Sequence, residues 1–400
     1  MTTTRSGPVS TAGAALGESC LRGYSDTPRR FGEGSRLVRF TGARGSHRIK
    51  PTDRTWSCAR STAALCGSVI LGIAFMSPPA IALPPGVTPE AKAAIDRGLS
   101  YLSRTQHRQG YWANRGTYGA YPVAMTGLAT LALLMDGNTT TQGRYAPNVD
   151  RAAHFLAASA QGSGLIAASE REPRSMYGHG FSMLALGQLY GMTEDVQRSR
   201  ELHQLLASAV ELTSRSQSRD GGWIYTPYSG GDEGSVTITQ VQALRSCRNA
   251  GIAVPKTVID DAMDYLARSQ NSDGGIRYTL RQRGGTSRAP ITAAAVCCWF
   301  NAGQYGNPRA IKALVYCKRH IKPRLLAMPH FYYAHFYMAH ALYISQDPDW
   351  DEYYAGLRDT LLTLQESDGS WPSAVGDIYS TSVALVILQL PFNQLPIMQK

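Results

Sequence analysis

The sequence lacks the patterns that mark metal sites and β-structure. Seven cysteines occur among the 400 residues, but they form no CxxC pair and no cysteine–histidine spacing typical of a metal site. Neither period-two hydrophobic alternation nor an Asn-Gly hairpin turn is present. The sequence therefore predicts no metal ion and no cofactor. We expect the adjacent Cys297 and Cys298 to pack as small core residues.

The positive charge of the chain is unevenly distributed. The net charge is +11, and residues 1–60 alone contribute +7 of it. These 60 residues are rich in Arg, Gly, Ser and Thr and show no hydrophobic periodicity, which predicts a disordered basic leader. Because the rest of the chain carries little net charge, its composition does not indicate nucleic-acid binding.

Residues 61–82 contain no charge and have the organisation of an export signal. An apolar run of about 14 residues at 63–76 follows Arg60, and Ala80-Ile81-Ala82 forms a small-x-small cleavage site. The run is short for a transmembrane helix. This pattern predicts a protein exported to the periplasm or the extracellular space, with a mature domain at 83–400. An uncleaved signal would instead leave the protein anchored to the membrane.

From residue 88 onward the chain repeats every 40–55 residues or so. Each unit predicts an apolar-periodic helix, a Gly-rich loop and a second apolar helix. We expect the first helices near 90–105, 148–160, 201–216, 257–269, 308–320 and 351–364. We expect the second helices near 121–135, 177–190, 235–249, 289–302, 331–345 and 378–390.

Helix composition indicates how these hairpins pack. The second helices, such as ITAAAVCCWF, are apolar nearly all round, as is typical of helices buried on both sides. The first helices, such as VIDDAMDYLARS, carry charge on one face. Because a single hairpin cannot bury its apolar face alone, we predict an all-α (α/α)6 toroid with the second helices inside and the first helices outside.

The loop after the first helix carries a repeated motif. It reads QHRQGYW at 106–112, QSRDGGW at 217–223, QNSDGGI at 270–276 and QESDGSW at 365–371. We expect its glycines to adopt positive φ and its glutamines to bond free backbone groups at helix ends. Its tryptophans supply large packing surfaces. The predicted structural residues are Gln106, Trp112, Gln217, Trp223, Gln270, Gln365 and Trp371.

The motif resembles the QW motif of squalene and oxidosqualene cyclases and the glycine-rich repeats of prenyltransferase β subunits, over about residues 88–390. The resemblance implies an α/α toroid whose ligand occupies the space inside the inner ring. Squalene-hopene cyclases, which this pattern resembles, carry a DxDD acid motif just before an inner helix. The matching positions here read Glu233-Gly234-Ser235-Val236 and Asp377-Ile378-Tyr379-Ser380, which lack the adjacent acids. The Asp-x-Cys zinc ligands of the prenyltransferases are missing too, because Ala295 and Val296 precede the cysteine pair.

Aligning the six inner helices gives a polar column, which we predict to line the central cavity with tyrosines near its mouth. In the alternative, each hydroxyl bonds a carbonyl of its own helix one turn back. The catalytic residues stay undetermined, with Glu233, Asp377, His179 and His335 as candidates. The predicted cavity residues are Thr126, His179, Thr237, Thr292, His335, Thr381, Tyr177, Tyr333 and Tyr379.

Three functions agree with this sequence. The missing acids favour a toroid that binds an apolar, isoprenoid-like ligand or a protein partner, and peripheral membrane association would suit such a ligand. A divergent terpene cyclase or isomerase with another acid is the second alternative. A polysaccharide hydrolase or lyase is the third, but it needs two carboxylates beside a groove, and the inner helices contain few acids.

Overall fold

The computed structural model describes residues 82–399, except residues 117 and 283. The predicted leader at 1–60 and all but the last residue of the predicted export segment at 61–82 lie outside these residues, so both stay predictions. Within the described part, no helix is long and apolar enough to cross a bilayer.

The described residues contain twelve α-helices that alternate between an outer and an inner position, as the repeat predicts. The outer helices are α1 (Pro89–Thr105), α3 (Ala146–Ala158), α5 (Val196–Ser216), α7 (Lys256–Ser269), α9 (Pro308–His320) and α11 (Trp350–Leu364). The inner helices are α2 (Pro122–Met135), α4 (Ser175–Tyr190), α6 (Gly234–Asn249), α8 (Ala289–Asn301), α10 (Phe331–Ser345) and α12 (Asp377–Gln389). These bounds confirm the twelve predicted helices.

Only α5 departs from its predicted bounds by more than two residues, and it does so at its first turn. It begins at Val196, where residue 201 was predicted. The preceding Asp195 accepts a hydrogen bond from Arg198 N at 2.6 Å and caps the helix. Hydrophobic periodicity missed this turn because Val196 is exposed and the next four residues are polar, so a cap holds the turn and not packing.

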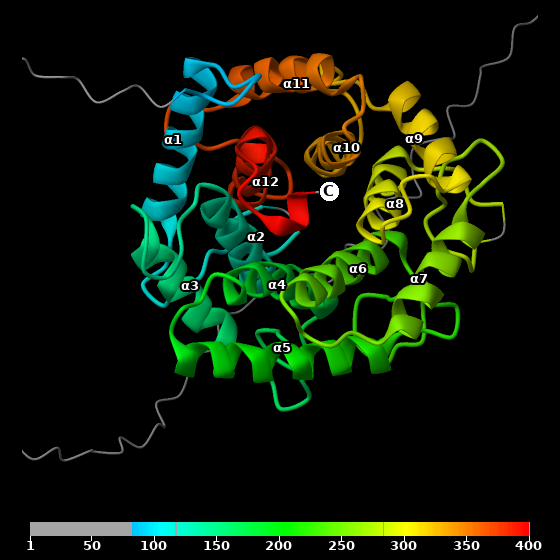
Figure 1. Ribbon diagram of the computed structural model, residues 1–400, viewed down its shortest axis with the longest axis horizontal. Helices are drawn as coiled ribbons and strands as arrows, with labels where there is room; N and C mark the ends of the chain where they lie inside the picture. Colours follow the sequence, from blue (N-terminus) through cyan, green and yellow to red (C-terminus); the bar gives the residue numbers. More distant parts are fainter. Residues whose placement is uncertain (1–81, 117, 283, 400) are drawn as a thin grey trace, which may run out of the picture. The chain divides into compact units, whose positions relative to one another are not determined.

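The inner helices form a closed ring (Figure 1). Each one packs against the next, and α12 packs against α2, so the last inner helix closes on the first. Close approach depends on small residues: a Cβ on Gly127 of α2 would lie 2.8 Å from the backbone of Phe181 in α4. The fold is therefore an α/α toroid, in agreement with the predicted fold class.

The outer helices are amphipathic and bury one face against the inner ring. In α7, for example, Val258, Ala262, Tyr265 and Leu266 are buried, whereas Asp264 is exposed. Burying such an apolar stripe against the inner helices stabilises each outer helix, because a short helix is marginal in water. The charged residues that marked the outer helices in the sequence thus face away from the ring.

The two ends of the ring differ. All six inner helices begin at one end, which we call the mouth, and finish at the other, which we call the closed end. At the closed end, the C-terminal segment forms the short 3-10 helices η1 (Leu390–Phe392) and η2 (Pro396–Met398). Ile397 N donates to Gln188 Oε1 of α4 at 3.3 Å, and Ile397 O bonds His340 Nε2 of α10 at 3.1 Å. Figure 1 places the C-terminal residues within the ring, where they join these two walls.

Candidate functional site

The motif glutamines connect neighbouring hairpins. Gln106 Nε2 donates to Gly110 O in its own loop and to Asn148 O in α3, both at 2.9 Å. Gln217, Gln270 and Gln365 form the same pair of bonds, one to a loop glycine and one to the next outer helix. Gln365 reaches Ala94 O of α1 at 2.9 Å, which joins the last hairpin to the first.

The motif tryptophans are completely enclosed. Trp112, Trp223 and Trp371 are at most 1% exposed. Each indole Nε1 donates to the carbonyl ten residues earlier, at 2.7 Å for Trp112 and Trp371 and 2.8 Å for Trp223. This satisfies a carbonyl near the end of the preceding outer helix. The motif is thus a structural connection between an outer helix, its loop and the next hairpin.

The predicted polar column does exist, but it faces the outer loops and not a central cavity. All six side chains have 0% exposure, whereas a side chain beside a water-sized cavity would keep accessible surface. Four threonine hydroxyls accept the amide hydrogen of the last motif residue, at 2.8–3.0 Å: Thr126 from Trp112, Thr237 from Trp223, Thr292 from Ile276 and Thr381 from Trp371. The prediction that these four threonines line a central cavity is therefore wrong, because their hydroxyls bond the motif loops.

His179 takes the place of a threonine in this column. Its Nδ1 accepts from Ile166 N at 3.1 Å, so Nε2 carries the hydrogen that bonds Thr213 Oγ1 of α5 at 3.0 Å. Burial lowers the pKa of His179 to about 4, which keeps the ring neutral. His179 is therefore a structural residue, and its prediction as a cavity or catalytic residue is wrong.

His335 also faces outward. Its Nδ1 bonds the hydroxyl of Tyr353 in α11 at 2.6 Å, and burial lowers its pKa to about 3. The hairpin that contains His335 has no motif loop, so an outer-helix tyrosine supplies the partner that a loop amide supplies elsewhere. Its Nε2 is buried and has no hydrogen-bond partner among the described residues. The prediction of His335 as a cavity residue is wrong because its ring lies against Tyr353 of the outer helix α11.

Sequence reasoning missed a fifth copy of the motif at 161–166, QGSGLI. It is one residue shorter than the others between Gln and Gly, and it ends in Ile, as the copy at 270–276 does. Gly164 nevertheless has a φ of 92°, and Ile166 supplies the amide that bonds His179. A glutamine followed closely by a glycine at the end of an apolar-periodic helix was the signal that could have found it.

The predicted tyrosines do lie at the mouth. Tyr177, Tyr333 and Tyr379 each occupy the third position of an inner helix and remain partly exposed. Burial raises the pKa of all three phenols, which indicates that they lie deep between the helices. Burial has the largest effect on the pKa of Tyr333, and four nearby groups raise it further. These groups are the phenols of Tyr337, Tyr177 and Tyr379 and the carboxyl of Glu233, so all of them lie in one region.

Glu233 lies at the same mouth but is enclosed. It caps α6 by accepting from Ser235 N at 3.0 Å and Val236 N at 2.9 Å. Ser235 Oγ lies 2.7 Å from both carboxyl oxygens, and the hydroxyl of Tyr177 lies 2.6 Å from Ser235 Oγ. Burial raises the pKa of Glu233, while its hydrogen bonds oppose that shift. Glu233 is 1% exposed, so its carboxyl is linked to the mouth by its hydrogen bonds with Ser235 and, through Ser235, with Tyr177.

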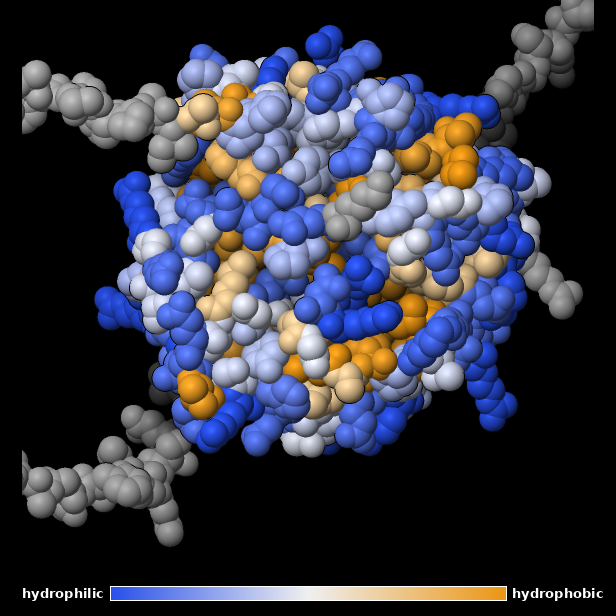
Figure 2. Space-filling view, in the orientation of Figure 1, coloured by the Kyte–Doolittle hydropathy of each residue, from blue (hydrophilic) through white to orange (hydrophobic). Residues whose placement is uncertain are grey.

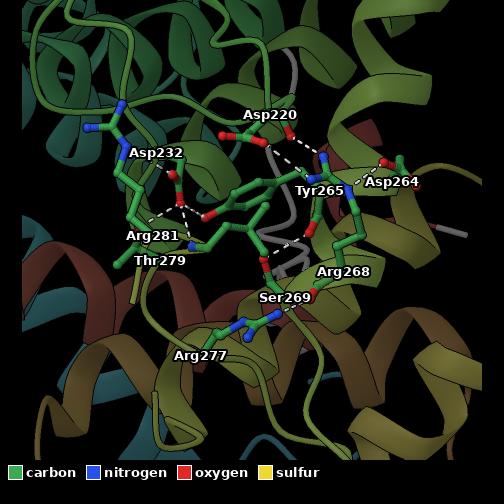
Figure 3. Close-up of polar contacts among 10 residues, drawn as sticks. Asp220, Asp232, Asp264, Tyr265, Arg268, Ser269, Arg277, Thr279 and Arg281 are labelled. Atoms are coloured by element: carbon green, nitrogen blue, oxygen red, sulfur yellow. Dashed lines mark hydrogen bonds and ion pairs between the residues drawn. The ribbon is translucent and has the colours of Figure 1, made fainter. Parts of the chain in front are cut away.

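The neighbouring Asp232 belongs to a different network, shown in Figure 3. Its Oδ2 accepts from the hydroxyl of Tyr265 at 3.1 Å, Thr279 Oγ1 at 2.8 Å and Leu280 N at 2.8 Å. Arg281 Nε lies 3.9 Å from the other oxygen. Asp232 thus joins two loops to α7, and the two adjacent acids serve separate sets of partners.

Two arginines lie over tyrosines of the mouth loops. Arg174 Cζ is 5.2 Å from the ring centre of Tyr225, and Arg288 Cζ is 4.7 Å from that of Tyr278. The two tyrosine hydroxyls bond each other. This places positive charge and aromatic rings together at the edge of the mouth.

The last candidate acid, Asp377, is exposed at the first position of α12. The four cysteines of the described part are buried free thiols, and burial raises the pKa of Cys297 and Cys298, as expected of core residues. Among these described residues, no three His, Cys, Asp or Glu side chains gather as a metal site would require.

Comparison with known proteins supports the fold. The sequence matches no protein-family model and no curated protein sequence. The structure is similar to the type II terpene cyclase MstE from Scytonema (TM-score 0.54, 13% identity, 76% of this chain and 98% of that chain). It is also similar to an α-1,6-mannanase from Salegentibacter (0.55, 11%, 75% and 98%) and to a heparin-specific unsaturated glucuronyl hydrolase (0.53, 15%, 75% and 96%). The chain therefore has a terpene-cyclase-like toroid fold, which glycoside hydrolases share.

Proposed function

We propose that this protein is an exported toroid that binds an apolar, isoprenoid-like ligand inside the inner ring, entered from the mouth. The observation that carries the proposal is the group of mouth tyrosines, Tyr177, Tyr333 and Tyr379. They are partly exposed although burial raises the pKa of each phenol. Aromatic walls with few polar groups are typical of pockets for apolar ligands.

Tyr333 supports a ligand with a polar end. Its hydroxyl is buried and has no hydrogen-bond partner among the described residues. An unmade hydrogen bond of this kind costs on the order of 1–3 kcal/mol, which a ligand hydroxyl would recover. Arg174 and Arg288 add positive charge at the edge of the mouth. A prenyl alcohol with its chain inside the ring would bond the Tyr333 hydroxyl, and its oxygen can also accept a hydrogen bond from a guanidinium group.

The enclosure of both acids argues against polysaccharide hydrolysis, which the mannanase and the glucuronyl hydrolase suggest as an alternative. A glycosidase brings two carboxyl groups into contact with the sugar. Asp232 and Glu233 are only 3% and 1% exposed, and their partners lie in different networks. Asp377 is exposed but is a single acid.

A binding experiment tests the proposal. Geranylgeraniol and squalene are titrated into the full chain by calorimetry, for the native protein and Tyr333→Phe. We expect both ligands to bind the native protein. The variant should bind the alcohol about fivefold more weakly, because it loses one hydrogen bond of about 1 kcal/mol, and should bind squalene unchanged. Tyr228→Phe, at a residue 60% exposed, is the control. Failure of both ligands to bind the native protein would refute the proposal.

A divergent terpene cyclase is the second candidate, and the chain of contacts from Glu233 through Ser235 to Tyr177 favours it. Burial raises the pKa of this carboxyl, so it holds a proton more readily than an exposed glutamate. Alkene protonation nevertheless needs a much stronger acid, such as clustered carboxyls provide. Because Glu233 stands alone on the inner side, binding without cyclisation remains our first proposal.

A further inference from the structure

A cavity lies at the closed end, away from the mouth tyrosines. It has a volume of about 210 Å³ and opens between the last turns of α6 and α8 and the first turns of α7. Val241, Leu244, Ile259 and Met263 give it an apolar wall. Figure 2 shows hydrophobic surface gathered where α6 and α7 meet, with hydrophilic surface directly beside it.

Positive charge lines the opposite side of this cavity. Arg245, Arg248 and Lys256 all contribute to it. Asp260 also lines the cavity and is paired with Lys256 at 2.6 Å. Neither arginine forms an ion pair with a carboxylate within the part of the chain that the structure describes. The cavity therefore joins an apolar wall to two unneutralised guanidinium groups.

The environment of Arg245 is unfavourable for a charge. Burial lowers its pKa, and the neighbouring charge of Arg248 lowers the pKa further. Two like charges beside an apolar surface repel each other, and a half-buried position screens them less than open water does. An anion between them would remove this repulsion, and guanidinium groups bind carboxylates through paired hydrogen bonds.

Asn301 provides an independent indication of a ligand. It ends α8, lines the same cavity and is 5% exposed. Its Nδ2 is buried and finds no hydrogen-bond acceptor among the described residues. A buried amide donor is rarely left without a partner. An oxygen atom held by Arg245 could also accept from this donor.

We propose that this closed-end cavity binds a small organic anion with an aliphatic tail, with a medium-chain carboxylate as its chemistry. The carboxylate lies at Arg245, Arg248 and Asn301, and the tail lies against the apolar wall. The volume of about 210 Å³ equals that of roughly seven water molecules at ~30 Å³ each, which suits a chain of about eight carbons. This site is separate from the mouth and does not rest on the proposed function.

Calorimetry of the full chain with octanoate and with 1-octanol tests the site. We expect octanoate to bind one to one and 1-octanol at least tenfold more weakly, because only the anion relieves the repulsion between the arginines. Arg245→Gln should weaken octanoate binding at least tenfold, and Arg219→Gln, at an exposed residue of a mouth-end loop, should leave it unchanged. Equal binding of the acid and the alcohol, or no effect of Arg245→Gln, would overturn the proposal.

A second variant separates this site from the mouth. Ala302 lines the cavity at the end of α8, and Ala302→Trp should fill it. We expect this variant to lose octanoate binding and to bind geranylgeraniol as the native protein does. If Ala302→Trp still bound octanoate with native affinity, the anion would have to lie elsewhere and the proposal would be wrong.

Discussion

At the residue scale, the motif glycines combine positive φ with close backbone contact. Gly221 has a φ of 86°, and a Cβ there would lie 2.2 Å from Asp261 O of α7. Gly251 has a similar φ of 88°, but a Cβ there would meet nothing within 4 Å. Comparing substitutions at Gly221 and Gly251 therefore separates the free-energy cost of the positive φ from that of the close contact with α7.

We expect Gly251→Ala to destabilise the protein by about 1 kcal/mol through its conformation alone. Gly221→Ala should cost several times as much, because the outer helix must also move to admit the methyl group. Urea denaturation of the two variants measures both values. Equal losses would mean that the loop does not depend on this approach to α7.

The motif tryptophans allow a second prediction at this scale. Trp371 has 0% exposure and bonds Leu361 O at 2.7 Å. Trp371→Ala should lower the free energy of unfolding by about 3–5 kcal/mol, as other large-to-small core changes do. Trp350→Ala, at a half-buried residue of α11, is the control and should cost clearly less. Similar melting temperatures for the two variants would refute the structural role of the motif.

His179 makes stability depend on pH. Its folded pKa of about 4 lies below the reference value of 6.5, so between these values the unfolded chain binds more protons than the folded one. The contribution of His179 to stability is therefore lost as pH falls through this window, and this contribution does not change further below about 4.

His179→Thr should reduce this pH dependence. The unfolded variant has one proton less to bind near pH 5, so the slope of stability against pH should fall by about 1.4 kcal/mol per pH unit. Threonine occupies this column in four other hairpins and can accept the same amide hydrogen. Urea denaturation between pH 4.5 and 7 measures the slope, and an unchanged slope would contradict the assigned pKa.

The polar column shows how far single residues could be predicted. The alignment placed Thr126 and His179 in one column correctly, because the repeat fixes equivalent positions. It could not give the direction of the column, because the inner helices are buried on both faces and their hydrophobicity has no polar side. The repeat placed the three tyrosines near the start of their inner helices, whereas their role as cavity residues stays a prediction.

At the element scale, helix type and order could be predicted almost completely. One-sided charge identified the outer helices and all-round hydrophobicity the inner ones. The loops before the inner helices could not be predicted, because their contacts are distant in sequence. Asp232 bonds Thr279 across 47 residues, and Glu233 contacts Tyr177 across 56. No local pattern could show that these two adjacent acids belong to different networks.

The C-terminal segment was not predicted as a structural element, and it provides the prediction at this scale. Ile397 is 2% exposed and joins α4 to α10 through its backbone. Ile397→Ala should cost about 2–5 kcal/mol of stability, whereas Gln399→Ala, at an exposed residue, should change little. Thermal unfolding compares them. If Ile397→Ala left the melting temperature unchanged, the C-terminal segment would not stabilise the closed end.

At the scale of the whole described domain, closure of the ring follows from its hydrogen bonds and packing. Gln365 bonds α1, and α12 packs on α2, so no hairpin is terminal as it would be in an open solenoid. Six hairpins in the sequence suggested this closure, but the ligand could not be predicted from it. The same fold occurs in a terpene cyclase and in glycoside hydrolases, so the fold alone does not decide the function.

The central claim is that the mouth binds an isoprenoid without converting it, and the fate of bound squalene tests this most directly. The full chain is incubated with squalene, and the recovered lipid is analysed by mass spectrometry for the native protein and Glu233→Gln. We expect unchanged squalene with both proteins, because Glu233 is a single enclosed acid that caps α6. A cyclic triterpene formed by the native protein and absent with Glu233→Gln would contradict it and establish a cyclase.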